Sequence, residues 1–361
     1  MSEADPVAII DGLRRIGFAL ERNPTRRHQA RAFLRAARNL ARLESGELEF
    51  HLQAGTLTQL PGVGDSIAGA IRDLAQGIEP AYWHSASLEA APEPSDAAAA
   101  ELLRALRGDC HAHSNWSDGA VEIEEMALAA RDLGHEYMVL TDHSPSLTIA
   151  HGLSVERLEQ EIEIVERLNL ELAPFRILTG IECDILADGS LDQTEELLSR
   201  LDVVVASVHS LLRQPAAEMT PRLLAAVRNP HTDILGHCTG RIVTGRGRPQ
   251  SQFDAEAVFA ECARHGVAVE INSRPERMDP PGDLLMLAMQ AGCSFSIDSD
   301  AHTPGQLAWQ YFGCEHAARC EVTPDRVINT APLDVFLARI AGRRGTSFPS
   351  LRSLPGEEEA G

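Results

Sequence analysis

The sequence predicts a parallel α/β domain preceded by a small, all-helical domain. Two observations lead to this prediction. Between residues 105 and 341, seven short apolar or β-branched runs alternate with amphipathic helical stretches, a pattern typical of a parallel sheet. Before residue 80, only helical periodicity is found. A chain of 361 residues is long enough for one large and one small domain.

The first 80 residues are expected to be helical throughout. "VAIIDGLRRIGFALE" has apolar residues at helical spacing, and "TRRHQARAFLRAARNLARLE" carries arginine opposite an apolar face. In residues 56–76, apolar positions with helical spacing flank a Pro-Gly-Val-Gly sequence. We therefore expect two short helices joined by a glycine hairpin, a helix-hairpin-helix.

Residues 81–104 are rich in Ala, Ser and Pro, and we expect them to be a linker. Residues 342–361 are expected to form a disordered tail. The predicted strands lie between these segments, at 108–113, 136–143, 175–185, 203–210, 233–240, 267–274 and 293–302.

The bulk composition excludes several classes of protein. There is no apolar run of about 18 residues and no signal-like N-terminus, so we expect a cytoplasmic protein without a membrane partner. Seven cysteines without a C-x-x-C pair argue against a disulfide framework. The net charge of −21 disfavours nonspecific nucleic-acid binding. However, residues 11–44 carry nine arginines and only three acidic residues.

Histidine and carboxylate side chains recur at the predicted ends of the strands. They are His111, His113, Asp118, His143, Glu182, His209, His237, Asp300 and His302. In an α/β barrel, the C-terminal ends of the strands share one face, so these side chains are expected to converge. Imidazole and carboxylate together suit Mn, Zn or Fe better than Ca. Nine ligands are enough for three ions if one carboxylate bridges.

The sequence also resembles a known family. "DCHAHSNWSDG", "VLTDHSPSL", "VEINSRPERMD" and "IDSDAHTPGQL" are similar to motifs of the PHP (polymerase and histidinol phosphatase) domain, especially that of bacterial family X DNA polymerases. The resemblance spans about residues 105–335 and implies a distorted seven-stranded, TIM-like (β/α) barrel with three divalent ions. It assigns one ion to His111, His113, Glu182 and Asp300, a second to Glu182, His209 and His237, and a third to Asp118, His143 and His302.

The N-terminal residues resemble the helical domain of the same polymerases. The polymerase core is missing, because only about thirty residues separate position 76 from position 108. The chain also contains no lysine, so a lysine Schiff-base lyase activity is not expected.

These features predict hydrolysis of phosphate esters by metal-bound hydroxide, with Glu182, Asp300 and His237 in catalytic positions. Asp109 and Asp142 are candidates for orienting the ligand histidines. Arg241, Arg274 and Arg277 are candidates for holding a substrate phosphate. The candidate DNA contacts are Gly62, Val63, Gly64, Arg26, Arg27, Arg31, Arg35 and the neighbouring Arg38.

Three functions remain open from the sequence. The first is action on DNA 3′ ends in repair, as a 3′–5′ exonuclease or a 3′-phosphatase. The second is a small-molecule phosphatase of the histidinol-phosphate or nucleotide-monophosphate type, which the acidic barrel favours. The third is a DNA-end binding protein whose barrel is only structural, and the complete ligand set argues against it.

Overall fold

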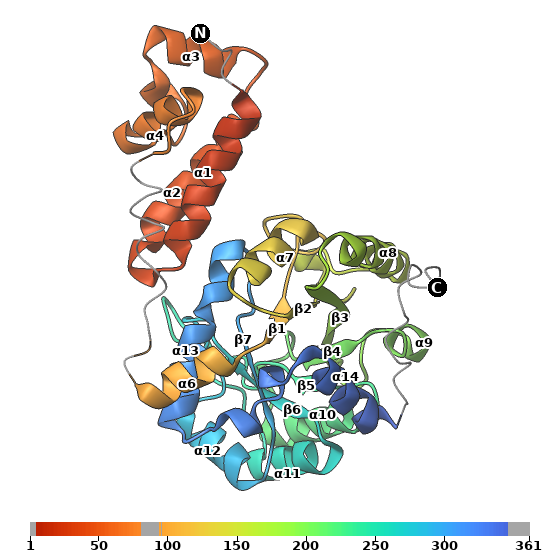
Figure 1. Cartoon of the computed structure of the whole chain (residues 1–361). Coiled ribbons are helices and arrows are strands. Elements are labelled where there is room, and N and C mark those ends of the chain that lie inside the picture. Colours follow the sequence, from red (N-terminus) through yellow and green to blue (C-terminus); the bar gives the residue numbers. More distant parts are fainter. Residues whose placement is uncertain (1–4, 81–93, 95, 346–361) are drawn as a thin grey trace, which may run out of the picture.

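The computed structural model describes residues 5–80, 94 and 96–345, and it confirms a seven-stranded parallel α/β barrel with a helical N-terminal unit (Figure 1). The strands are β1 (Gly108–Ala112), β2 (Tyr137–Leu140), β3 (Arg176–Asp184), β4 (Val203–Ser207), β5 (Ile234–Leu235), β6 (Ala268–Asn272) and β7 (Phe295–Asp298). They pair in chain order, and every pair is parallel. An isolated bridge between Ala112 and Ala301 brings the two edges together, so the barrel is nearly closed.

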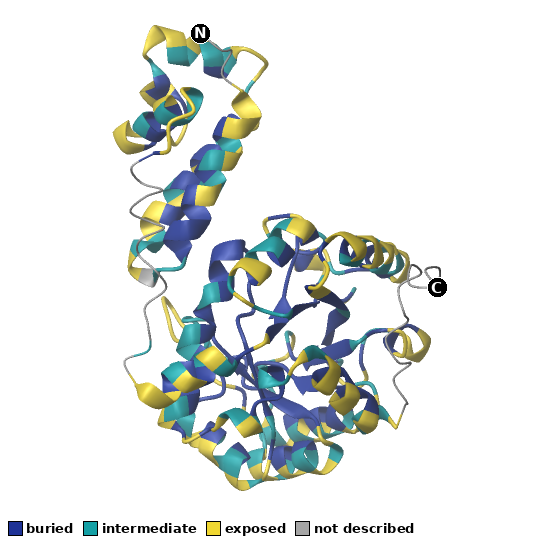
Figure 2. Cartoon of the chain, in the orientation of Figure 1, coloured by how far each residue is buried: buried dark blue, intermediate teal, exposed yellow. Residues whose placement is uncertain are grey.

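The strands are buried along almost their whole length, as Figure 2 shows, because helices cover them outside and side chains fill the interior. The barrel is irregular at β5, which has only two residues. Gly236 follows β5, and a Cβ added there would lie 2.2 Å from the Ser207 hydroxyl oxygen. The glycine therefore lets the end of β5 approach the end of β4 closely.

The helices around the barrel are α6 (Ala97–Ala105), α7 (Ile123–Asp132), α8 (Val155–Glu171), α9 (Glu195–Leu198), α10 (Ala216–Arg228), α11 (Ala255–His265), α12 (Gly282–Gln290), α13 (Gln310–Arg319) and α14 (Leu333–Arg344). Helix α14 packs Phe336 and Ile340 against residues near the N-terminal ends of the strands, including Tyr137 and Ala268. One end of the barrel is thus covered, and the opposite end is available for a site.

Two features of the chain differ from the sequence-based expectation. Residues 97–104 of the expected linker are helical in α6, which Asp96 caps by accepting a hydrogen bond from the Ala98 N–H. Helix α14 continues to Arg344, into the segment expected to be disordered. The remainder of that tail, residues 346–361, lies outside the described residues.

The N-terminal unit contains α1 (Pro6–Glu21), α2 (Arg27–Leu40), α3 (Glu47–Ala54) and α4 (Asp65–Ala75), which share their own apolar core. The first helix expected in 56–76 is only a 3-10 turn, Leu57–Gln59. Leu60 is extended, as expected for a residue before proline, and Pro61 has no N–H to continue a helix. Gly62 then adopts a φ of 81° in the turn before α4.

The C-terminal end of α1 docks on the loop that follows β7. Phe18 joins an apolar cluster of barrel residues, and the Trp309 indole N–H donates to the Glu21 backbone carbonyl at 3.1 Å. The Thr303 hydroxyl donates to the Glu21 carboxylate at 2.5 Å. Gly305 makes the close approach possible, because a Cβ there would lie 2.1 Å from the Phe18 carbonyl oxygen. Among the described residues, no helix combines the length and apolar character needed to cross a bilayer.

We expect Gly305→Ala to destabilise the protein by about 1–3 kcal/mol, because the added methyl group collides with the backbone of α1. The measurement is the urea midpoint of unfolding. Gly69→Ala in α4 is the matched control, since a Cβ at Gly69 has no neighbour within 4 Å and alanine favours a helix. Equal midpoints for Gly305→Ala and the wild type would contradict the docking.

Candidate metal centre

The nine strand-end residues singled out in the sequence surround one hollow at the open end of the barrel. Its volume is about 460 Å³. The ligand-type residues that line it are Asp118, His143, Glu182, His209, His237, Asp300 and His302. His111 and His113 are fully buried beside them. The structure therefore brings all nine together.

The Glu182 carboxylate lies at the centre of this group, almost fully buried at 1% exposure. One oxygen, Oε1, is 2.9 Å from His237 Nε2 and 3.2 Å from His209 Nε2. The other, Oε2, is 3.3 Å from His111 Nε2 and 2.8 Å from His143 Nδ1. Burial raises the pKa of this carboxyl, but the surrounding imidazoles outweigh burial and hold the pKa well below its usual value.

Two further carboxylates extend the group toward the rim. Asp118 Oδ1 lies 3.5 Å from His143 Nε2 and 3.3 Å from His302 Nε2. Asp300 Oδ1 lies 3.5 Å from His113 Nε2. Asp300 has a φ of 53°, an uncommon conformation for a residue other than glycine. Such conformations persist where the surrounding structure holds a functional side chain in place.

The donor atoms fit divalent metal ions. Two ligands bound to one tetrahedral zinc ion lie about 3.3–3.6 Å apart, because each bond is about 2.0–2.2 Å long. Several pairs described above have this spacing. The buried atoms His111 Nε2, His113 Nε2, His209 Nε2 and Glu182 Oε2 have no hydrogen-bond partner within the described part of the chain. Buried polar atoms without partners are costly, and cations would satisfy them.

The ligand-type atoms form three overlapping groups, each with its atoms within 4.8 Å of one another. They are His113, Asp118, His143 and His302; His111, His113 and Glu182; and His143, Glu182 and His209. This grouping differs from the resemblance-based assignment in several respects, since neither Asp300 nor His237 belongs to any of the three groups. His113 also approaches the Asp118 group, and His143 also approaches Glu182.

Two carboxylates that the sequence analysis missed orient the imidazoles. Glu270 Oε1 lies 2.6 Å from His111 Nδ1, and Glu270 also accepts the His237 backbone N–H. Asp184 Oδ1 lies 3.0 Å from His209 Nδ1. Partners of this kind fix which ring nitrogen faces a metal. The role of Asp184 could have been predicted from its spacing, because it lies two residues after Glu182 and therefore on the same face of β3.

Asp109 and Asp142, predicted as the orienting residues, have another role. Asp109 accepts backbone N–H groups of His111 and Ser299. Asp142 accepts the backbone N–H and the hydroxyl of Ser114. Neither bonds a ligand imidazole in the described hydrogen bonds. Asp142 is adjacent to His143, and neighbours along an extended chain point to opposite sides. Asp109 is two residues before His111, but its carboxylate is occupied by the backbone N–H groups of His111 and Ser299.

Two of the three arginines proposed for phosphate binding line the hollow. Arg274 Nη1 donates to the Asp300 backbone carbonyl at 2.9 Å, and Arg277 Nε lies 3.2 Å from Asp300 Oδ2. Arg277 Nη1 is buried without a partner in the described structure. Arg241 instead donates to the backbone carbonyls of Arg277 and Met278 and does not line the hollow. Its role is to hold the loop that carries Arg277.

The candidate DNA-contact residues of the N-terminal unit separate into two groups. Arg27 pairs with Glu276, which lines the metal hollow, and both Arg27 and Arg274 lie over the Trp309 ring, 6.0 Å from its centroid. Arg26 donates to Gln29 at 2.8 Å. Arg31, Arg35 and Arg38 follow Arg27 along the same face of α2 and are exposed, and Gly62, Val63 and Gly64 form the turn before α4.

The chain is similar in sequence to known proteins of one family. A family model described as PHP domain matches residues 109–274. DNA polymerase/3′-5′ exonuclease PolX of Bacillus subtilis is 39% identical over 240 residues, which is 66% of this chain but only 42% of that protein. A "probable phosphatase" of Photobacterium profundum is 30% identical over 204 residues, covering 54% of this chain and 77% of its own length.

One solved structure among the matches is the histidinol phosphate phosphatase of Lactococcus lactis, in complex with zinc, L-histidinol and phosphate. It is 18% identical to this chain, with a TM-score of 0.42, and the match covers 67% of this chain and 94% of that one.

Addition of Mn²⁺ or Zn²⁺ to chelator-treated protein is expected to raise the melting temperature, because ions bind the native cluster and not the dispersed ligands of the unfolded chain. The stabilisation is about 2.7 kcal/mol at an ion concentration one hundred times the dissociation constant. Glu182→Gln should abolish this shift, whereas His231→Ala, outside the cluster, should retain it. An unaltered shift in Glu182→Gln would contradict the metal centre.

The metal-induced shift is also expected to grow as the pH rises from about 6.5 to 9. Burial disfavours the charged His209 imidazole, but the carboxylates of Glu182 and Asp184 outweigh it and raise the pKa to about 9. In the metal-free protein this proton stabilises the fold below pH 6.5, and the contribution is lost as the pH rises through 9. Metal binding requires the deprotonated ring, so its affinity increases over the same range. Titration calorimetry at several pH values measures this, and a pH-independent affinity would contradict it.

Proposed function

Because the chain belongs to the PHP-domain family and is a hydrolase of phosphate esters, we propose that it acts on the 3′ ends of DNA, as a 3′–5′ exonuclease or a 3′-phosphatase in repair. The observation that carries the proposal is the position of the arginine-rich N-terminal unit, whose Arg27 pairs with a residue of the metal hollow. A small-molecule phosphatase has no need for such a unit. The similarity to a protein named as a 3′-5′ exonuclease supports the same choice.

The proposed cofactors are three divalent ions, of Mn, Zn or Fe, which the seven grouped residues would hold together with Asp300 and His237 beside them. Such ions supply the acidity that makes water nucleophilic at neutral pH, and they neutralise charge on the phosphoryl group. Glu182 would offer both of its oxygens to the ions, and Glu270 and Asp184 hold the Nδ1 atoms of His111 and His209. These two carboxylates therefore fix the orientations of the two rings before substrate arrives.

Arg274 and Arg277 are proposed to bind the substrate phosphate. Both lie beside Asp300, and the Arg277 Nη1 group has unused donor capacity at the hollow. A guanidinium donates two parallel hydrogen bonds to phosphate oxygens and remains charged at every physiological pH. Asp300, Glu182 and His237 are the proposed catalytic residues, since they line the same hollow as these arginines.

A small-molecule phosphatase is the second candidate. The hollow of about 460 Å³ is large enough for a histidinol-phosphate or a nucleotide monophosphate. Several matched proteins, including the Photobacterium protein, are named as probable phosphatases. The net charge of −21 also suits a small ester better than a long polyanion.

The deciding experiment compares 3′-labelled single-stranded DNA with a panel of phosphomonoesters, each with added Mn²⁺. We expect release of 3′ nucleotides or 3′ phosphate, with His237→Ala and Arg277→Gln lowering the rate by about 100-fold or more, a loss typical for one electrostatic contact to the transition state. His231→Ala is the control and should keep the wild-type rate.

Intact DNA together with rapid turnover of one monoester would favour the second candidate. DNA binding without hydrolysis of any substrate would favour the third reading, a non-catalytic DNA-end binding protein.

A further inference from the structure

We propose that a groove between the N-terminal unit and the barrel rim binds the sugar-phosphate backbone of a single-stranded polynucleotide whose 3′ end enters the metal hollow. This inference rests on the proposed function and specifies its substrate. The groove, here called the arginine groove, has a volume of about 400 Å³. It is lined by Arg14, Phe18, Glu21, Arg31, Leu34, Arg35, Arg38, Ala120 and Thr303.

Positive charge dominates the arginine groove. Arg31, Arg35 and Arg38 are spaced i, i+4 and i+7 on α2, so they project from one face of the helix. Glu21 is the one acidic residue among the lining residues, and it is 7% exposed with its carboxylate accepting the Thr303 hydroxyl. Burial raises the pKa of Glu21 above its usual value. Arg14 lies 3.8 Å from the exposed Asp11 carboxylate, whereas Arg31, Arg35 and Arg38 form no salt bridge within the described part of the chain. Guanidinium groups of this kind are suited to phosphate.

The arginine groove shares a wall with the metal hollow. The Ala120 N–H donates to the His302 carbonyl at 2.8 Å, and Thr303 directly follows His302. Asp118, which lines the metal hollow, lies two residues before Ala120, which lines the groove. The two hollows are therefore separated by only one or two residues, on the order of 7 Å of extended chain. A strand leaving the metal hollow reaches the arginine groove within a few nucleotides.

The other end of the groove meets the glycine turn. A Cβ built on Gly62 would lie 3.7 Å from Arg35 Nε and 3.1 Å from Asn39 Nδ2. The Asn39 amide also donates to the Pro61 carbonyl at 2.8 Å. Arg35 thus lies between the turn and the groove, and the backbone N–H groups at the start of the nearby α4 are donors of the kind that bind phosphate. The proposed path of the strand runs from the turn through Arg35 and Arg31 to the metal centre.

The anchoring of the N-terminal unit favours one strand over a duplex. The unit is fixed to the barrel on one side by Phe18 against Gly305, and on another by the Arg27–Glu276 pair at the wall of the metal hollow. The arginine groove is a confined space between these packed elements. Its volume is that of a site for one small ligand, which matches a segment of a single strand.

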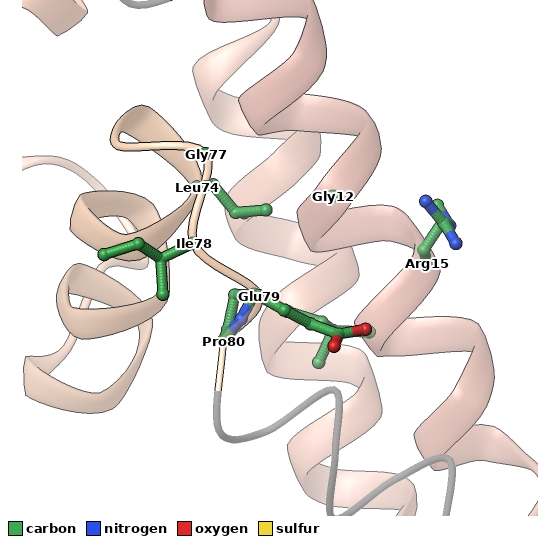
Figure 3. A pocket seen from close by; sticks show the side chains of 8 residues that line it. Gly12, Arg15, Leu74, Gly77, Ile78, Glu79 and Pro80 are labelled. Carbon is green, nitrogen blue, oxygen red and sulfur yellow. The ribbon is translucent and has the colours of Figure 1, made fainter.

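A hollow elsewhere on the same unit serves as a contrast (Figure 3). It has a volume of about 290 Å³ and lies between α1 and the segment that follows α4. Its lining includes Leu74, Ile78 and Pro80, with Glu79 and the single cation Arg15. This composition does not favour a polyanion, in contrast to the lining of the arginine groove.

The test is a triple variant, Arg31→Gln/Arg35→Gln/Arg38→Gln, compared with Arg131→Gln/Arg167→Gln/Arg319→Gln. Both variants lose three exposed charges, but the second set lies outside the groove. Binding of a labelled oligothymidylate with phosphorothioate linkages is followed by fluorescence anisotropy over a salt series. We expect the groove variant to bind at least about tenfold more weakly, with a salt slope smaller by about 2, or about 0.7 per lost phosphate contact.

The hydrolysis rates separate this inference from the proposed function. In the groove variant, the ratio of the DNA rate to the small-ester rate should fall about tenfold, and in the control variant the ratio should not change. Equal binding by wild type and groove variant would overturn the groove even if DNA is hydrolysed. Equal losses in both variants, equal loss on small esters, or duplex binding as tight as single-strand binding would overturn it as well. Weakened binding in a protein that hydrolyses no DNA would support the groove and refute the proposed function.

Discussion

The buried carboxylate of Glu182 is the constraint on which the site depends. It lies among imidazoles from four other strand ends, and several of their nitrogens have no partner in the described structure. Even with the neighbouring carboxylates, several of these buried ring nitrogens and one Glu182 oxygen have no hydrogen-bond partner within the described part of the chain. Such a cluster is costly for a protein alone and favourable with cations present. The apolar burial of the barrel strands stabilises the fold and offsets the free-energy cost of this polar cluster.

The barrel and the ligand set could be predicted from the sequence for a common reason. Strands of a parallel barrel end on one face, so the positions of His143, His209 and His237 after apolar runs were enough to place them together. Glu270 was missed because it stands within "VAVEINSR", which has the character of a buried strand without a ligand. Its role appears only once β6 lies near the end of β1, a contact between residues far apart in the chain.

The roles of the N-terminal arginines were harder to predict, because residues on one helix face can meet different partners along the length of the helix. Arg27 and Arg31 belong to one arginine-rich stretch, yet Arg27 pairs with Glu276 of the barrel while Arg31 lines the groove. Helix α6 was missed because its alanine run follows a Pro- and Ser-rich segment. Local composition gave no sign of its packing against α13, which is set by tertiary structure.

The contact between α1 and the loop after β7 has a thermodynamic consequence. The loop after β7 receives Glu21 at Thr303, and the residue before Thr303 is His302, a member of one of the candidate metal-binding groups. If metal binding at this group stabilises the loop, it also stabilises the contact between the loop and α1. By reciprocity, that contact then strengthens metal binding by the same free energy. Metal binding and docking of the N-terminal unit are thus coupled. A ligand that binds the N-terminal helices and changes their docking would therefore change the metal affinity at His302 without contacting it.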